Sequence, residues 1–210
     1  MTDQMESKKT GTTNVVIRYN GGIVLGAEKK VTMGYLVDGT HVRKVYPIDE
    51  HIAMTIAGMV GDLQSIVRYL RAEVKLYKLQ KGERIGVRSA ATLLANILQG
   101  AKYFPYMGQF LLAGVDNKGP QLYSLDAYGG VVDGEDYLAA GSGMPYALGV
   151  LEDQYKSNIT RDQGITLTLK ALRAATKRDI ASGGDGFTII VIDETGSKEL
   201  SEKEIDSYLK

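Results

Sequence analysis

The order of its segments most constrains how this 210-residue chain can fold. Strand-like segments come in runs joined by short turns, and helix-like segments come in pairs between those runs. Along the chain, the pattern predicts strands, two helices, strands, two helices, one strand and a short helix. A doubly wound parallel sheet needs strands and helices in alternation, which this order lacks. We therefore expect antiparallel sheets with helices packed on their outer faces.

Tight turns separate the predicted strands. Asn20-Gly21 and Asp38-Gly39 are typical hairpin turns, and segments rich in apolar or β-branched residues flank them. The predicted strands are residues 13–19, 22–28, 35–37, 41–46, 51–57, 109–115, 121–124, 137–140 and 187–192. Several of these strands are apolar on both faces, which favours burial on both sides. The predicted fold class is α+β, a four-layer αββα sandwich of two antiparallel sheets between helix layers.

Apolar residues that recur every three or four positions predict the helices. The predicted helices span residues 60–81, 87–103, 145–155 and about 165–179, and a short helix begins after 201. Gly82 ends the first helix and Pro105 stops the second. Ser201, with Glu204 three residues further on, forms the sequence pattern of a capping box at the start of the last helix.

Composition and charge exclude several functions. The chain has 25 Lys and Arg against 25 Asp and Glu, so no basic face for nucleic acid is indicated. It has no cysteine, which excludes disulfides, thiolate zinc sites and a cysteine nucleophile. Residues 1–11 lack the apolar centre of a signal peptide, and no segment approaches the roughly 18 apolar residues of a membrane span. We expect a cytoplasmic protein with no membrane contact.

Several well-known catalytic and binding motifs are absent. His41 and His51 have no Cys, Asp or Glu at metal-ligand spacing, and we expect neither a metal nor a cofactor. Ser142 lies in Ala-Gly-Ser-Gly-Met and not in the G-x-S-x-G elbow of α/β hydrolases. The chain contains no G-x-x-x-x-G-K-[ST] loop for nucleotide phosphates. Any chemistry must therefore come from other residues.

Three charged residues allow more than one interpretation. Asp179 continues the apolar stripe of the fourth helix, where a carboxylate needs a partner and could form either a structural ion pair or part of a site. Lys44 would share a strand face with Val42 and Tyr46, where burial disfavours its charge unless an anion is near. Alternatively, Lys44 protects a sheet edge or reaches solvent. Glu28, taken alone, indicates only a solvated charge.

Gly11-Thr12-Thr13 lies where a polar tail meets the first predicted strand. Cleavage of the sterically open Gly–Thr bond would give Thr12 a free α-amine, whose pKa of about 7.7–8.0 suits a base at neutral pH. Such an amine can accept the proton of its own residue's hydroxyl, which activates the threonine as a nucleophile. Taken alone, the same residues could simply begin a β-strand.

A set of motifs carries a resemblance that extends from Gly11 to about Leu209. The motifs are Gly11-Thr12-Thr13, residues 28–33, Lys44, residues 55–62, residues 102–107, Gly141-Ser142-Gly143 and residues 178–183. In this order and spacing they closely resemble a proteasome β-subunit of the archaeal type. The resemblance implies the N-terminal nucleophile hydrolase fold and threonine endopeptidase activity. It also implies a propeptide, residues 1–11, that the subunit removes itself, and a single catalytic domain, residues 12–210.

The resemblance further implies roles for individual residues. Thr12 Oγ would attack the Gly11 carbonyl and, once the tail is released, the carbonyl of a substrate. Lys44 would lower the pKa of that hydroxyl, and Glu28, where many relatives have Asp, would hold Lys44. The Gly58 N–H would donate to the oxyanion. The other implied site residues are Ser142, Asp179 and Ser182 around the threonine amine, and Val31, Val42, Tyr46, Ile56 and Val60 in an apolar substrate pocket.

The same resemblance implies the partners. They are proteasome α-subunit rings, other β-subunits in a heptameric ring, an ATP-dependent unfolding regulator, and unfolded proteins cut after large hydrophobic residues. Asn14 and Val16 depart from the threonine and glycine that are common in archaeal relatives. Three alternatives stay open: a non-catalytic ring subunit, a different N-terminal nucleophile hydrolase that acts on small amides, and a peptide-binding module, which would leave the Gly11-Thr12 junction unexplained.

Overall fold

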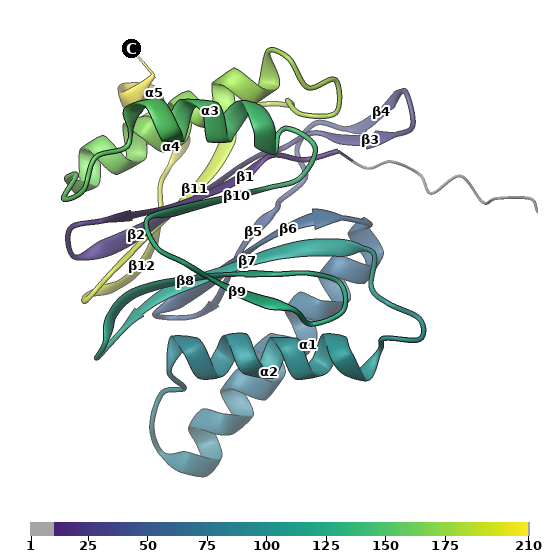
Figure 1. Cartoon of the computed structure of the whole chain (residues 1–210), viewed down its shortest axis with the longest axis vertical. Helices are drawn as coiled ribbons and strands as arrows, with labels where there is room; N and C mark the ends of the chain where they lie inside the picture. Colours follow the sequence, from purple (N-terminus) through teal and green to yellow (C-terminus); the bar gives the residue numbers. More distant parts are fainter. Residues whose placement is uncertain (1–10, 210) are drawn as a thin grey trace, which may run out of the picture.

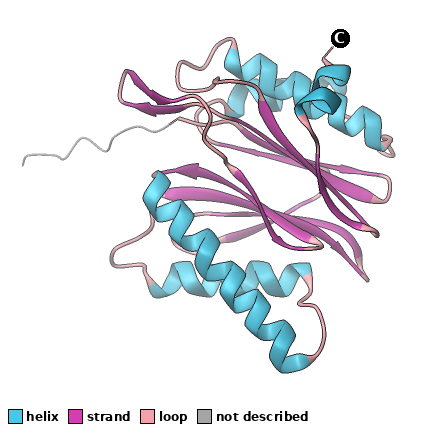
Figure 2. Ribbon diagram, turned by 180° about the vertical axis from the view of Figure 1, so that it is seen from behind, coloured by secondary structure: helices cyan, strands magenta, loops and turns pink. Residues whose placement is uncertain are grey.

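Two five-stranded antiparallel sheets lie face to face, and helices cover the outer face of each, in a computed structural model that describes residues 11–209 (Figure 1). Figure 2 shows the same four layers from behind. The layer order is therefore helix, sheet, sheet, helix. The predicted α+β sandwich of two antiparallel sheets is confirmed.

The first sheet has the strand order β10-β1-β2-β11-β12. Its strands are β1 (Asn14–Tyr19), β2 (Gly22–Glu28), β10 (Tyr137–Ala140), β11 (Phe187–Asp193) and β12 (Gly196–Glu199). The helices on this side are α3 (Met144–Gln154), α4 (Arg161–Thr176) and α5 (Glu202–Tyr208). As predicted, β1 and β2 form a hairpin that reverses at Asn20-Gly21, where Gly21 adopts a φ of 94°.

The second sheet is a meander with the order β5-β6-β7-β8-β9. Its strands are β5 (Val45–Asp49), β6 (Ile52–Gly58), β7 (Gly108–Asp116), β8 (Gly119–Leu125) and β9 (Val131–Gly134). Helices α1 (Val60–Lys81) and α2 (Val87–Gly100) cover it. Gly82 ends α1 in the left-handed conformation, as its position predicts.

Apolar side chains fill the three spaces between the four layers. On β1, Val15 and Ile17 pack under the helices of their own side, whereas Val16 between them lies in the layer that separates the sheets. On β6, Met54 packs toward α1 and α2, and Ala53 faces the other sheet. Because successive strand residues point to opposite faces, strands with two buried faces must be apolar throughout.

The second predicted hairpin is wrong in its turn. β3 (Val31–Met33) pairs with β4 (Leu36–Gly39), and the chain reverses at Gly34-Tyr35 instead of Asp38-Gly39. Gly34 adopts a φ of 63°, which glycine reaches without steric cost. Residues 40–44 form no strand, so Lys44 precedes β5 and has no strand face.

Two helix ends also differ from the prediction. α2 ends at Gly100 and not near Tyr103. α4 ends at Thr176, so Asp179 lies beyond the helix in a turn rather than on its buried face. The backbone N–H groups of Arg178 and Asp179 both donate to the carbonyl of Ala175, which closes the last turn. The capping box of Ser201 and Glu204 at the start of α5 is confirmed.

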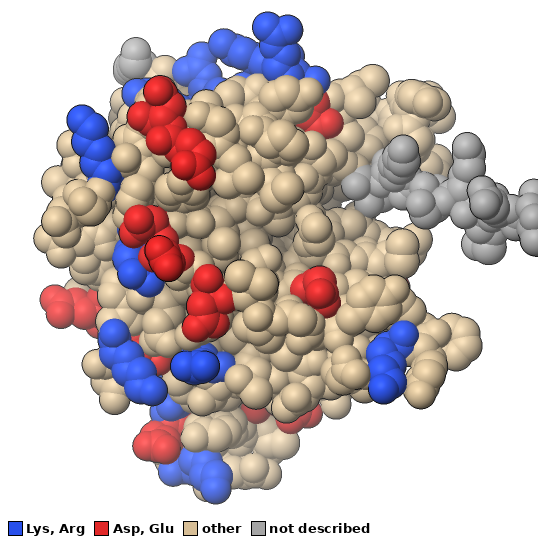
Figure 3. Space-filling model, viewed as in Figure 1, with Lys and Arg blue, Asp and Glu red and all other residues tan. Residues whose placement is uncertain are grey.

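Charged side chains of both signs are interspersed on the face drawn in Figure 3. Among residues 11–209, no helix is both long and apolar enough to cross a membrane.

Candidate active site

Thr12 lies two residues before the start of β1, and it is only 3% exposed. Its Oγ1 donates to the carbonyl oxygen of Gly11 at 2.6 Å, and its backbone N–H donates to Ser142 Oγ at 3.1 Å. The backbone N–H of Gly143 donates to the carbonyl oxygen of Thr12 at 3.3 Å. A side chain at Gly11 would overlap Ala181, so only glycine fits before Thr12 without rearrangement.

Glu28, the last residue of β2, is fully buried and has four hydrogen-bond donors around its carboxylate. Oε1 accepts from the N–H of Thr13 at 3.2 Å and from Lys44 Nζ. Oε2 accepts from the N–H groups of Lys30 at 2.7 Å and Gly183 at 3.0 Å. A buried carboxylate needs such compensation, and these donors tie β1, β2 and the 179–184 loop together. The interpretation of Glu28 as a solvated charge is therefore wrong.

Lys44 is 4% exposed and points into the same cluster. Its ammonium group donates to Glu28 and to the Lys30 carbonyl, and it lies 3.4 Å from the Gly11 carbonyl oxygen. Burial lowers the pKa of Lys44 below its ordinary value, and the neighbouring Glu28 carboxylate opposes that shift. The alternative of an edge lysine that reaches solvent is excluded by this burial.

Asp179 connects two serines beside Thr12. Its Oδ2 accepts from Ser142 Oγ at 2.5 Å and from Ser182 Oγ at 2.6 Å. Ser182 Oγ also lies 2.6 Å from Thr13 Oγ1. Thr13 thus links this network to Glu28, a role that its position in the sequence gave no reason to assign. The contact between Thr13 and Ser182 thereby joins residues that are 169 positions apart in the chain.

Gly58, the last residue of β6, adopts a φ of 141°, and a Cβ there would collide with the Met107 backbone. It lines a small cavity of about 10 Å³ next to Thr12. The other lining residues are Gly11, Val31, Val42, Arg43, Lys44, Ile56, Val60 and Leu63. Four of the five predicted pocket residues are thus present. Tyr46 is not among them, and its hydroxyl donates to the Arg43 carbonyl at 2.7 Å.

The geometry around Thr12 suits attack on the bond before it. A hydroxyl lies against the carbonyl oxygen of Gly11, and a buried ammonium group approaches the same oxygen. An ammonium beside a carbonyl stabilises negative charge that develops on its oxygen. Within residues 11–209, no group of three or more His, Cys, Asp or Glu side chains could hold a metal ion.

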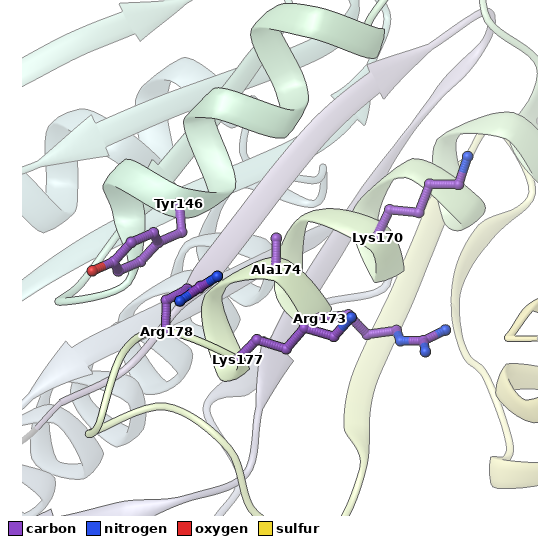
Figure 4. A pocket seen from close by; sticks show the side chains of 6 residues that line it. All are labelled: Tyr146, Lys170, Arg173, Ala174, Lys177 and Arg178. Atoms are coloured by element: carbon purple, nitrogen blue, oxygen red, sulfur yellow. The ribbon is translucent and has the colours of Figure 1, made fainter.

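A larger hollow of about 420 Å³ lies elsewhere, between α3 and the C-terminal part of α4 (Figure 4). Its lining includes Tyr146 from α3 and four cationic side chains. They are Lys170, Arg173, Lys177 and Arg178. No predicted site residue lines this hollow, so it is separate from the cluster around Thr12.

The fold and the cluster define the class of protein. Two antiparallel sheets between helix layers, with a threonine before the first strand in contact with a lysine-bearing cluster, are the architecture of an N-terminal nucleophile hydrolase. A model of the proteasome subunit family matches residues 8–192. The chain therefore belongs to the proteasome subunit family, as its resemblance predicts.

Relatives from archaea match over the whole chain. Proteasome subunit beta 1 of Thermococcus onnurineus is 48% identical over 98% of this chain and 100% of its own length. Proteasome subunit beta of Methanoregula boonei is 43% identical over 100% of this chain and 98% of its own. Proteasome subunit beta 2 of Pyrococcus abyssi is 44% identical over 99% of each. Within the family, the chain is thus similar to archaeal β-subunits.

Proposed function

We propose that the chain is a catalytic β-subunit of a proteasome core particle, a threonine endopeptidase whose nucleophile is Thr12. The observation that carries the proposal is the position of Thr12 Oγ1, which contacts the Gly11 carbonyl within reach of Lys44. A subunit that only builds rings would not need a buried lysine aimed at the bond before its first strand. Glu28 supports this arrangement because it compensates the buried ammonium.

The first reaction in the proposal is self-processing. Thr12 Oγ attacks the Gly11 carbonyl carbon, its proton passes to the departing nitrogen, and the Gly11–Thr12 amide bond breaks to leave an ester. Water then hydrolyses the ester, which releases residues 1–11 and leaves a free α-amine on Thr12. Apart from Gly11, this segment lies outside the described residues. The catalytic domain would then comprise residues 12–210.

The second reaction is hydrolysis of substrate peptides. The α-amine of Thr12, with a pKa of about 7.7–8.0 in free peptides, takes the hydroxyl proton as Oγ attacks the substrate carbonyl. Lys44 stabilises the developing alkoxide, and the Gly58 N–H donates to the oxyanion. Ser142, Asp179 and Ser182 hold the amine in place. The amine leaving group departs with a proton, and water hydrolyses the acyl-enzyme ester without a cofactor.

The cavity beside Thr12 supports a preference for hydrophobic residues. Its side-chain lining includes Val31, Val42, Ile56 and Val60, whose apolar surfaces favour an apolar substrate side chain. Because the cavity is only about 10 Å³, a large side chain requires it to open. Release of products that end in large hydrophobic residues is expected from a peptide library, and a preference for basic residues would refute this pocket.

Exposed apolar side chains support assembly into a larger particle. Tyr35 and Leu36 at the β3–β4 hairpin are 95% and 67% exposed, and Phe104 in the loop before β7 is 91% exposed. Clustered exposed apolar side chains mark protein contacts. The proposed partners are other β-subunits in a heptameric ring, α-subunit rings, and an ATP-dependent regulator that delivers unfolded proteins in the cytoplasm.

Intact mass measurement tests the proposal after co-expression with a proteasome α-subunit. We expect the wild-type chain to lose residues 1–11 and Thr12→Ala to retain them. Thr13→Ala is the matched control because Thr13 is the adjacent threonine and, among residues 11–209, its hydroxyl hydrogen-bonds only to Ser182; it should still be cleaved. A wild-type chain that keeps its tail within assembled rings would favour the non-catalytic ring subunit.

A further inference from the structure

Two buried polar side chains near Thr12 have no hydrogen-bond partner among residues 11–209. They are Asn14, whose Oδ1 and Nδ2 are both unpaired, and Thr55, whose Oγ1 is unpaired. Both residues are 0% exposed. Buried polar groups in folded proteins are nearly always paired with protein or with ordered water, because an unpaired group loses its hydration without compensation.

Strand alternation places both side chains in the layer between the sheets. Asn14 is two residues before Val16, which lies in that layer, and Thr55 is two residues after Ala53, which lies there too. The register sets Asn14 between Ala27 of β2 and Ala140 of β10. The neighbours of Thr55 are Val45 and Leu111, and all four flanking residues belong to the same packed cluster.

These neighbours offer no polar partner. Their side chains are purely aliphatic, so they cannot donate or accept. Asn14 has an alanine on each side, whereas the next row of the layer, at Val16, is filled by Leu25 and Leu138. A water molecule that has two to four polar partners is the usual occupant of such a polar gap in a protein interior.

The two residues also belong to the chain segments that carry the proposed catalytic groups. Asn14 follows Thr12 by two positions in the first sheet. Thr55 in the second sheet lies opposite Val45, and the next residue, Ile56, donates its N–H to the Lys44 carbonyl at 3.0 Å. A bridge between Asn14 and Thr55 would therefore connect the segment that bears Thr12 with the segment that bears Lys44.

We infer that Asn14 and Thr55 hold an internal water molecule between the sheets, and that Asn14 thereby acts as a positioning residue for Thr12. The water accepts from Asn14 Nδ2 and exchanges hydrogen bonds with Thr55 Oγ1. Its role in catalysis rests on the proposed function, but its presence does not. Asn14 stands where a threonine is common in archaeal relatives, and holding this water would be its specific role.

A high-resolution crystal structure of the full chain tests the water directly. We expect density for one water within hydrogen-bond distance of the Asn14 carboxamide and Thr55 Oγ1, and its loss in Asn14→Leu. Direct hydrogen bonds from both side chains to protein groups, or an empty apolar gap, would overturn the inference. This result is independent of whether the chain is a peptidase.

A double-mutant cycle tests the positioning role in the assembled, processed enzyme. Asn14→Leu and Thr55→Val should each lower kcat for a peptide substrate about 10-fold with KM unchanged, because small misplacements of reacting groups are costly. The double variant should be no worse than either single variant, since the water is lost once either partner is gone. Asn14→Thr, which keeps a donor and an acceptor, should restore kcat to within about threefold of wild type.

Thr168→Val is the matched control for Thr55→Val. Thr168 is also a fully buried threonine, but its hydroxyl donates to the Gly164 carbonyl within α4 at 2.9 Å. This control should leave kcat unchanged. Single effects that multiply in the double variant, or variants that unfold more easily but keep kcat, would overturn the positioning role. If even the wild type neither processes itself nor cleaves peptides, the proposed function fails, and the same cycle on urea unfolding still tests the water.

Discussion

The polar residues around Thr12 form two pairs that differ in their access to water. The inner pair, Glu28 and Lys44, is 0% and 4% exposed and forms an ion pair. The outer pair, Ser142 and Asp179, lies at the surface and shares a hydrogen bond of 2.5 Å. Thr13 and Ser182 connect the two pairs.

The comparison shows that the same neighbourhood contains two kinds of polar interaction. A buried charge has no substitute for its partner, because water cannot reach it. A partly exposed carboxylate keeps solvent as an alternative partner, so its loss costs less stability. Under the proposed function, the inner pair would therefore support both the fold and the chemistry, whereas the outer pair would mainly orient groups.

The largest effect is expected when Lys44 is changed to Met. The substitution removes the ammonium beside the reacting carbonyl and leaves Glu28 charged and buried. Self-processing and peptide hydrolysis should fall by at least about 10²-fold. Lys30→Met is the matched control, because within the described part of the chain Lys30 Nζ donates to the exposed Ile180 carbonyl and not to the cluster around Thr12. Mass spectrometry and peptide assays measure both, and equal losses would contradict the special position of Lys44.

Glu28→Gln should have the next largest effect, and this effect should fall mainly on the free energy of unfolding. It leaves the Lys44 ammonium buried without a counter-charge, which lowers the free energy of unfolding by about 3–5 kcal/mol. Glu28→Asp keeps the charge on a shorter side chain and should cost less. Urea unfolding of the unprocessed full chain measures both values. Similar stability for wild type and Glu28→Gln would show that the inner pair is not essential to the fold.

Asp179→Asn should separate activity from stability. Asparagine keeps one acceptor oxygen and no charge, so it cannot accept from Ser142, Ser182 and the Ala181 N–H as the carboxylate does, and hydrolysis should fall about 10-fold because the Thr12 amine is less well held. The free energy of unfolding should change by no more than about 1 kcal/mol. Asp185→Asn is the control: Asp185 is an exposed residue just after the 179–184 loop, it pairs with His41, and its substitution should change neither quantity. A stability loss as large as that of Glu28→Gln would remove the distinction between the pairs.

The smallest effect is a pH dependence that comes from Lys44. Burial lowers its pKa, so the cation required by the proposal is lost at a pH below the ordinary lysine value, and hydrolysis should decline there. Between the lowered pKa of Lys44 in the folded chain and its ordinary value in the unfolded chain, the unfolded chain holds the proton more tightly than the folded chain. Stability should therefore rise with pH through the same window. Opposite slopes of kcat and of urea stability are the expected signature, and parallel slopes would assign the titration to another group.

Much of the fold could be predicted because strand and helix patterns have distinct periods. The β1–β2 hairpin, the two central helices and the capping box at Ser201 follow from local residues. The second hairpin was misplaced because Asp38-Gly39 and Gly34-Tyr35 are both suitable turns, and only pairing with the neighbouring segment selects one. The end of α4 was misplaced because Asp179 continues the spacing of a helix that the backbone has already closed.

The site residues were predicted from a resemblance and not from their local patterns. Nothing near Glu28 in the sequence indicates four donors around its carboxylate, and Thr13 had no assigned role. Tyr46 was assigned to a pocket that it does not line. Contacts between segments that are far apart in the chain leave no local signal.

The sequence by itself determined the layers of the sandwich, because periodicity, turns and glycine preferences act over a few residues. Only the tertiary structure decided which charges are buried and which polar atoms remain without partners. Burial depends on what several distant segments jointly exclude from water, and that exclusion exists only once β1, β6 and the 179–184 loop have come together.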